Sequence, residues 1–215
     1  MKKIYKRLLV TGTMRVGTTW MTKALWANDI DCQHECMGED GSVSWFFSID
    51  VPSYPYNPHN APARRTAHVG EGRRNDYEFG TVVHLIRDPL KTIGSMVSIM
   101  PTHEQQWLVD NGVIESMECK PKLLRMMQAW YNQNTEVETI ADMRFRLEDL
   151  VKKQELWDKL GRSMKTKLTL PDIGVRNASR GIFKARIFVA QDLVNADKTL
   201  ANNIFKKARR YGYPY

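Results

Sequence analysis

The chain has 215 residues, 42% of them hydrophobic and 26% charged, which is typical of one globular domain with a sizeable core and excludes a disordered chain. No apolar run reaches about 18 residues, so no transmembrane helix is expected, and three cysteines are too few for a disulfide framework. The formal net charge of +8 predicts anionic partners: a nucleotide, an acidic substrate or a nucleic acid. The first residues lack the features of a signal peptide, which together with the few cysteines favours a cytoplasmic location.

A strand-like segment near the start of the chain leads into a turn that contains two glycines. The apolar run of residues 8–10 precedes Gly12, and Gly17 follows five residues later. This is the glycine spacing of a phosphate-binding P-loop, in which backbone N–H groups surround an anion and the next helix directs its N-terminus at it. Thr18 and Thr19 add hydroxyl donors to the first turn of that helix.

The loop differs from the P-loop of nucleotide kinases at one position. A kinase loop has lysine directly after the second glycine, where it reaches the β- and γ-phosphates, whereas Gly17 is followed by Thr18. The nearest cation is Arg15, inside the loop. Taken alone, the two glycines also fit an ordinary strand–turn–helix junction.

The next segment brings two polar residues to the end of a second expected strand. Residues 18–28 have the apolar spacing of a helix, and residues 29–35 read as a strand that ends in His34 and Glu35. In a parallel, doubly wound sheet the carboxyl ends of the strands line the ligand crevice. We therefore expect His34 and Glu35 to lie beside the loop of residues 12–17.

The middle of the chain alternates irregular and periodic segments. Ser42 is expected to cap a short helix over residues 43–47. Residues 51–76, rich in proline, tyrosine and arginine, read as a long loop of the kind that binds substrate or covers a site. Residues 101–120 read as a polar connector, and residues 122–140 as a long helix whose methionine and tryptophan side chains belong to the core.

A buried-strand pattern over residues 82–86 ends at Arg87, and a helix is expected over residues 90–100. Arg87 and Ser95 are eight residues apart. An arginine offers a planar charged fork to a phosphate, and a serine hydroxyl in the following helix adds a further donor. An arginine after a strand is commonplace, so Arg87 and Ser95 indicate a phosphate site only in combination with the glycine loop of residues 12–17.

The remaining elements complete an α/β pattern. A strand, a helix, a loop and a closing helix are expected over residues 143–147, 148–160, 169–181 and 197–211. The loop carries Arg176 and Arg180. The order of elements predicts a single P-loop-like α/β domain over residues 1–215, with three α/β/α layers and a mostly parallel central sheet.

Residues 15–20 resemble the 5′-phosphosulfate loop of the sulfotransferases that use 3′-phosphoadenosine 5′-phosphosulfate (PAPS). The residues that match this loop position by position are Arg15, Val16, Gly17, Thr18, Thr19 and Trp20. At the position of Arg15 the cytosolic branch of the family has lysine, whereas many bacterial members have arginine. Arg87 and Ser95 match the family's 3′-phosphate signature, residues 34–45 resemble a branch of small bacterial sulfotransferases, and residues 146–150 resemble a family strand. Beyond that strand the similarity is loose.

The resemblance implies a metal-independent, in-line transfer of the sulfuryl group of PAPS to a hydroxyl or amine, with 3′-phosphoadenosine 5′-phosphate (PAP) as product. The loop amides, both threonines and Arg15 would bind the 5′-phosphosulfate, and Arg15 would neutralise the bridging oxygen as the bond breaks. Trp20 would stack on the adenine, unless it only packs in the core. Arg87 and Ser95 would hold the 3′-phosphate, with Arg176 or Arg180 completing the pocket.

The acceptor needs a general base, for which Glu35 is the first candidate and His34 the second. Either residue could instead only hydrogen-bond the loop. The basic loop of residues 51–76 suits a small-molecule or glycan acceptor that is anionic or polyhydroxylated. We predict no metal site, because Cys32, His34 and Cys36 lack the paired second cluster that a structural zinc needs.

Two functions of other classes stay open. A nucleoside or nucleotide kinase could use the same scaffold, but it would need the missing lysine and carboxylates for magnesium. A non-catalytic binder of a nucleotide or a nucleic acid would fit the net charge. However, the basic residues are spread along the chain and form no known nucleic-acid-binding motif, so no specific nucleic acid is predicted.

Overall fold

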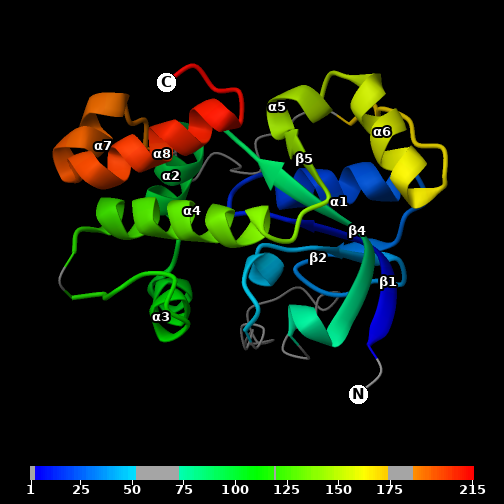
Figure 1. The fold of residues 1–215 in the computed structure, drawn as a ribbon, viewed down its shortest axis with the longest axis horizontal. Coiled ribbons are helices and arrows are strands. Elements are labelled where there is room, and N and C mark those ends of the chain that lie inside the picture. Colours follow the sequence, from blue (N-terminus) through cyan, green and yellow to red (C-terminus); the bar gives the residue numbers. More distant parts are fainter. Residues whose placement is uncertain (1–2, 52–72, 119, 174–185) are drawn as a thin grey trace.

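The computed structural model of the chain describes residues 3–51, 73–118, 120–173 and 186–215. Its centre is a five-stranded sheet in which every strand is parallel to its neighbours, in the order β2-β3-β1-β4-β5 (Figure 1). The strands are β1 (Ile4–Thr11), β2 (Cys32–His34), β3 (Gly41–Val43), β4 (Tyr77–Ile86) and β5 (Met143–Arg146).

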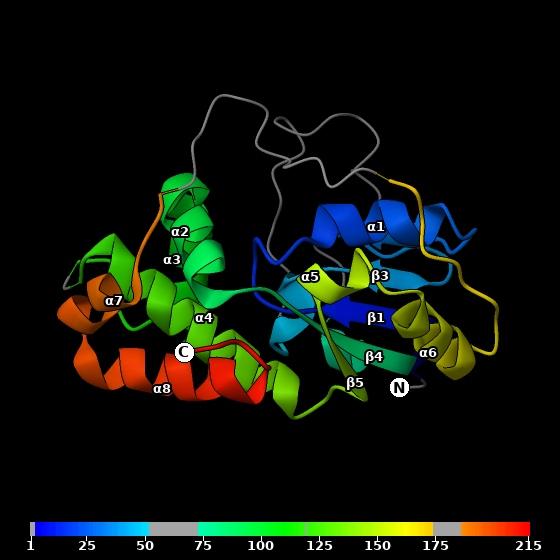
Figure 2. The ribbon, with the colours of Figure 1, turned by 90° about the horizontal axis from the view of Figure 1, so that it is seen from above.

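The helices surround this sheet and extend beyond one end of it. They are α1 (Thr18–Trp26), α2 (Pro89–Ile99), α3 (Thr102–Asp110), α4 (Lys122–Glu138), α5 (Leu147–Leu150), α6 (Gln154–Met164), α7 (Ala190–Ala196) and α8 (Lys198–Arg210), with the short 3₁₀ helices η1 (Phe46–Ser48) and η4 (Arg74–Asp76). Figure 2 shows α2, α3 and α7 gathered on one side of the molecule, and α1, α5 and α6 on the other, beside the sheet.

Two apolar clusters lie on opposite faces of the sheet. One joins Leu8 and Val10 of β1 to α1 and α6. The other joins Ile86, at the end of β4, to α2, α4 and α8. On this second face His84 of β4 lies 2.8 Å from Asn134 of α4. The layers are therefore helix, sheet and helix, and the predicted α/β fold with a parallel sheet and helices on both faces is confirmed.

The expected helix over residues 43–47 is wrong. Residues 41–43 instead form β3, which lies between β1 and β2 and pairs Leu8 with Gly41 and Val10 with Val43. Gly41 allows this close pairing, because a Cβ atom there would overlap the carbonyl oxygen of Leu8. The 3₁₀ helix η1 follows β3, over residues 46–48. Sheet pairing therefore prevails over the capping signal of Ser42.

Two other segments also differ from the prediction. The expected connector of residues 101–120 contains α3, which buries Trp107 and Leu108 while its other face is polar. The expected helix over residues 148–160 is divided into α5 and α6. The indole N–H of Trp157, on α6, donates to the carbonyl oxygen of Leu150, the last residue of α5, at 2.9 Å, so α6 folds back onto the end of α5.

The long helix of residues 122–140 is confirmed as α4, and it buries Met127 and Trp130 as expected. Most of the predicted binding loop, residues 52–72, lies outside the part of the chain that the structure describes, as do Arg176 and Arg180. Among the described helices, none is long and apolar enough to cross a membrane.

Candidate functional site

The turn between β1 and α1 has the backbone form that its glycines predict. Gly17, with φ 112°, and Arg15, with φ 65°, both adopt left-handed conformations. Gly12 lies so close to β4 that a Cβ atom would overlap the carbonyl oxygen of Leu85. Gly17 is also the N-cap residue of α1 and makes no side-chain cap, so this cap leaves the first N–H groups of the helix for another acceptor.

Arg15 connects this loop to α2. Its Nε donates to the hydroxyl of Ser95 at 3.2 Å, and its carbonyl oxygen accepts a hydrogen bond from Nη1 of Arg87 at 3.2 Å. The structure thus brings together the loop arginine and both residues that were predicted to hold the 3′-phosphate. Burial lowers the pKa of Arg15, Glu104 raises it, and nearby Arg87 lowers it again.

His34 lies at the loop, as expected from the end of the second strand. Its Nε2 is 3.0 Å from the hydroxyl of Thr18 and 3.1 Å from that of Thr19. These are the two residues that open α1. The contacts connect β2 to the first turn of the helix, so His34 and the two threonines form one hydrogen-bonded group.

Glu35 is held against the start of the segment after β3. Its Oε2 accepts hydrogen bonds from the hydroxyl of Ser44 at 2.8 Å and from the Trp45 N–H at 3.2 Å, while Oε1 is 3.4 Å from His34 Nε2. Removal from water raises the pKa of Glu35 to about 8, although the hydrogen bonds from Ser44 and Trp45 lower it in part. A carboxylate that titrates near neutral pH suits a general base.

Trp20 lies on α1 and is partly buried. Its ring meets Trp157 of α6 edge to face, with 6.2 Å between ring centroids. Its indole Nε1 is buried and has no hydrogen-bond partner among the described residues. Trp20 therefore packs against the core on one side, as the alternative interpretation expected, although it is not fully buried. Its stacking on an adenine stays a prediction.

Sequence reasoning missed Glu104, on α3, and Ser44. Burial raises the pKa of Glu104 and Arg15 lowers it, so the two charges act on each other. Trp107, three residues later on α3, packs against Trp45 at 5.4 Å between ring centroids, which turns this face of the helix toward the site. The apolar spacing within residues 101–120 could have predicted α3, but the polar composition of this segment favoured a connector.

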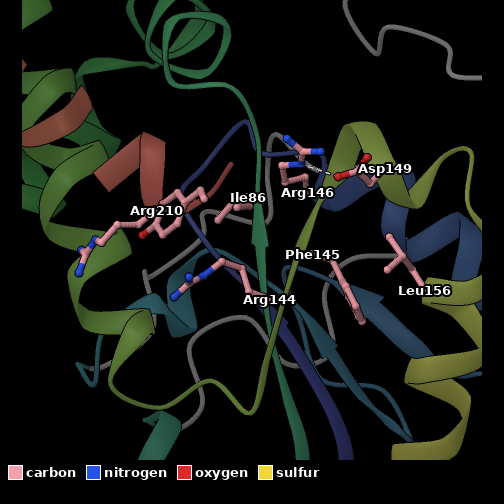
Figure 3. A pocket seen from close by; sticks show the side chains of 8 residues that line it. Ile86, Arg144, Phe145, Arg146, Asp149, Leu156 and Arg210 are labelled. Carbon is pink, nitrogen blue, oxygen red and sulfur yellow. Dashed lines mark hydrogen bonds and ion pairs between the residues drawn. The ribbon is translucent and has the colours of Figure 1, made fainter. Parts of the chain in front are cut away.

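A hollow of about 310 Å³ lies apart from the loop, at the outer edge of β5 (Figure 3). Its lining residues are Ile86, Arg144, Phe145, Arg146, Asp149, Leu156, Arg210 and Tyr211. Arg146 pairs with Asp149, and Arg144 and Arg210 share Glu138 at 3.6 and 3.3 Å. Because Glu138 is the last residue of α4, these two ion pairs join β5 to α4 and α4 to α8, and the pair of Arg146 with Asp149 joins β5 to α5.

Hydrogen bonds and close polar contacts among the described residues thus gather seven predicted site residues around one loop: Arg15, Thr18, Thr19, His34, Glu35, Arg87 and Ser95. Within the same part of the chain, no group of three or more His, Cys, Asp or Glu side chains could hold a metal ion. Comparison with models of protein families, with curated proteins and with solved structures finds no match to this chain.

Proposed function

We propose that the protein is a sulfotransferase that moves the sulfuryl group of PAPS to a hydroxyl or amine of a small-molecule or glycan acceptor and leaves PAP. One observation carries the proposal. The loop arginine, Arg15, is joined through its side chain to Ser95 and through its carbonyl oxygen to Arg87, beside a carboxylate with a raised pKa. The three residues are those that the donor's two anionic ends would need.

The donor would bind by two anionic groups. The N–H groups in the first turn of α1, which no side chain of the N-cap residue Gly17 caps, would receive the 5′-phosphosulfate together with the hydroxyls of Thr18 and Thr19. Arg87 would offer a bidentate fork to the 3′-phosphate, and Ser95 would add a hydroxyl donor. A 3′-phosphate distinguishes PAPS from ATP, so this second subsite would select the donor.

In the transfer step, an acceptor oxygen or nitrogen would attack the sulfur in line as the bond from sulfur to the bridging phosphate oxygen breaks. The acceptor proton would pass to the carboxylate of Glu35. Negative charge would develop on the departing oxygen, where Arg15 would stabilise it electrostatically. An arginine stays protonated at neutral pH, so it would not act as the acid.

The alternative of a P-loop kinase has less support, because the residue directly after Gly17 is Thr18 and not lysine. Calorimetric titration separates the two: the wild-type protein is titrated with PAP, with 5′-AMP and with ATP plus magnesium. Binding of PAP that exceeds binding of 5′-AMP and collapses in Arg87→Ala supports the sulfotransferase. A preference for ATP, or no binding of PAP, would contradict it.

A further inference from the structure

Two tyrosines in the segment after α8 reach back to the turn that carries Arg87. The hydroxyl of Tyr215 donates to Oδ2 of Asp88 at 2.7 Å, and the hydroxyl of Tyr213 donates to Oε2 of Glu148 at 2.8 Å. Asp88 is the residue directly after Arg87. We call these two tyrosines and their two acceptors the tyrosine clasp.

The other oxygen of each clasp carboxylate is occupied by the backbone of the same turn. Oε1 of Glu148 accepts the N–H of Asp88 at 3.2 Å. Oδ1 of Asp88 accepts the N–H of Lys91 at 3.0 Å and thereby caps α2. Each of the four carboxylate oxygens of the clasp therefore accepts a hydrogen bond, and these bonds hold both carboxylates in fixed orientations at the turn.

The segment after α8 is shaped to hold the clasp. Gly212 adopts a left-handed φ of 84°, and its carbonyl oxygen accepts a hydrogen bond from Nη1 of Arg146 at 2.6 Å. The guanidinium of Arg146 also lies over the ring of Tyr213, 5.4 Å from its centroid. The ring of Tyr215 stacks on Phe205 of α8, with 5.3 Å between centroids. These contacts fix both hydroxyls in place.

The protonation state of the two hydroxyls fits a donor role. Burial raises the pKa of Tyr213, and so does the neighbouring Glu148. Burial likewise raises the pKa of Tyr215, and so does its hydrogen bond to Asp88. Both hydroxyls therefore keep their protons over the whole neutral range and can donate without interruption.

Arg87 in turn holds the loop, because its Nη1 donates to the carbonyl oxygen of Arg15. Arg87 and Asp88 are adjacent in the chain, so an Asp88 carboxylate released by its tyrosine would be able to turn toward that guanidinium. An anionic ligand would then compete with a carboxylate for the same fork. The clasp thus has two effects: it holds the Asp88 carboxylate, which would compete with an anionic ligand for Arg87, and it fixes the turn that carries Arg87.

We propose that Tyr213 and Tyr215 are positioning residues of the anion site, which keep Asp88 and Glu148 away from Arg87 so that its guanidinium stays available to a 3′-phosphate. This proposal rests on the proposed function. Nothing in the sequence resemblance involves the segment after α8, and the four contacts of the clasp carry the argument.

The test uses Tyr213→Phe, Tyr215→Phe and the double variant, which keep the rings and remove only the hydroxyls. Calorimetry measures the affinity for PAP and for 5′-AMP. The double variant is expected to bind PAP about tenfold more weakly, since a charge-assisted contact is lost, while 5′-AMP affinity changes less than about twofold. Tyr211→Phe is the matched control, because Tyr211 neighbours Glu138 and Arg144 instead of the turn.

Hydrogen exchange gives a readout that needs no ligand. The amides of Asp88 and Lys91 are expected to exchange faster in the double variant, while amides of α4 stay unchanged. Three results would overturn the positioning role of the clasp alone. They are a double variant that keeps the wild-type preference for PAP over 5′-AMP, an equal loss of affinity for both nucleotides, and unchanged hydrogen exchange at Asp88. A wild-type protein without preference for PAP would overturn the proposed function and, with it, the role of the clasp in binding.

Discussion

At the scale of single residues, the site combines an arginine and a glutamate whose pKa values are shifted in opposite directions by their surroundings. Burial lowers the pKa of Arg15, whereas removal from water raises the pKa of Glu35 to about 8. Arg15 keeps its charge, because an arginine pKa lies far above neutral pH. Glu35, in contrast, exchanges its proton close to neutral pH. One residue is suited to stabilise charge and the other to accept a proton.

Replacement of Glu35 tests the assignment of the base. Glu35→Gln is expected to lower PAPS turnover about 10²- to 10⁴-fold, because the amide cannot accept the acceptor's proton. PAP affinity is expected to change little. The measurement is PAP release from PAPS, with water or an added alcohol or amine as acceptor, beside calorimetry with PAP. His34→Gln is the comparison variant, and a larger loss there than in Glu35→Gln would transfer the role to His34.

The pH dependence follows from the raised pKa of Glu35. Below about pH 8 the carboxyl group is protonated in the folded protein and cannot act as a base. The kcat/KM of the wild-type protein is therefore expected to rise with pH and to level off above about pH 8. The residual turnover of Glu35→Gln should show no such step. A wild-type profile that is flat from about pH 6 to pH 9 would exclude Glu35 as the base.

At the scale of elements, the sequence predicts what local patterns control. The apolar run before Gly12 and the glycine spacing predict the strand, the turn and the start of α1, because the backbone itself requires glycine at Gly17. Whether residues 41–43 pair as a strand depends on Leu8, which lies 33 residues earlier in the chain. In α3, Trp107 packs against Trp45, a contact between distant segments that adds to the local apolar spacing of residues 101–120.

The close pairing of β3 with β1 predicts a strong effect of Gly41→Ala. The added Cβ atom would overlap the carbonyl oxygen of Leu8, so the free energy of unfolding is expected to fall by about 3–4 kcal/mol. Gly112 is the control, because it also has a positive φ, of 69°, but faces open space. Gly112→Ala is expected to cost only about 1–2 kcal/mol. Urea unfolding measures both, and equal losses would refute the close pairing at Gly41.

At the scale of the whole molecule, the sheet connects the end that carries the candidate site to the buried polar contact between His84 and Asn134. The sequence predicted the three layers and the parallel sheet, and it placed His34 and Glu35 beside the loop because parallel strands end at one edge. It did not predict Glu104 or the tyrosine clasp. Tyr215 and Asp88 lie 127 positions apart, and only the folded chain brings them together.

The buried His84 joins two layers and predicts acid sensitivity. Its Nε2 contacts Asn134, its Nδ1 lies 3.4 Å from Nε of Arg144, and burial lowers its pKa to about 4. An unfolded histidine titrates near about pH 6.5, so the unfolded state gains the proton first as the pH falls. Stability is therefore expected to fall by about 3 kcal/mol between about pH 6.5 and pH 4.

His84→Gln removes the titrating group, so the difference between wild type and variant isolates this effect. Urea unfolding from about pH 7 to pH 4 provides the comparison, and other groups such as Glu35 cancel because both proteins contain them. The wild-type protein should lose more stability than the variant. Parallel curves would show that His84 is not the source of the acid sensitivity.

The most direct test of the central claim is a crystal structure of the protein with PAP. We predict the 5′-phosphate at the turn of residues 12–17 and the start of α1, and the 3′-phosphate at Arg87 and Ser95, with Arg15 near the position of the departing oxygen. PAP in the hollow beside β5, or a 3′-phosphate that makes no contact with Arg87, would contradict the account.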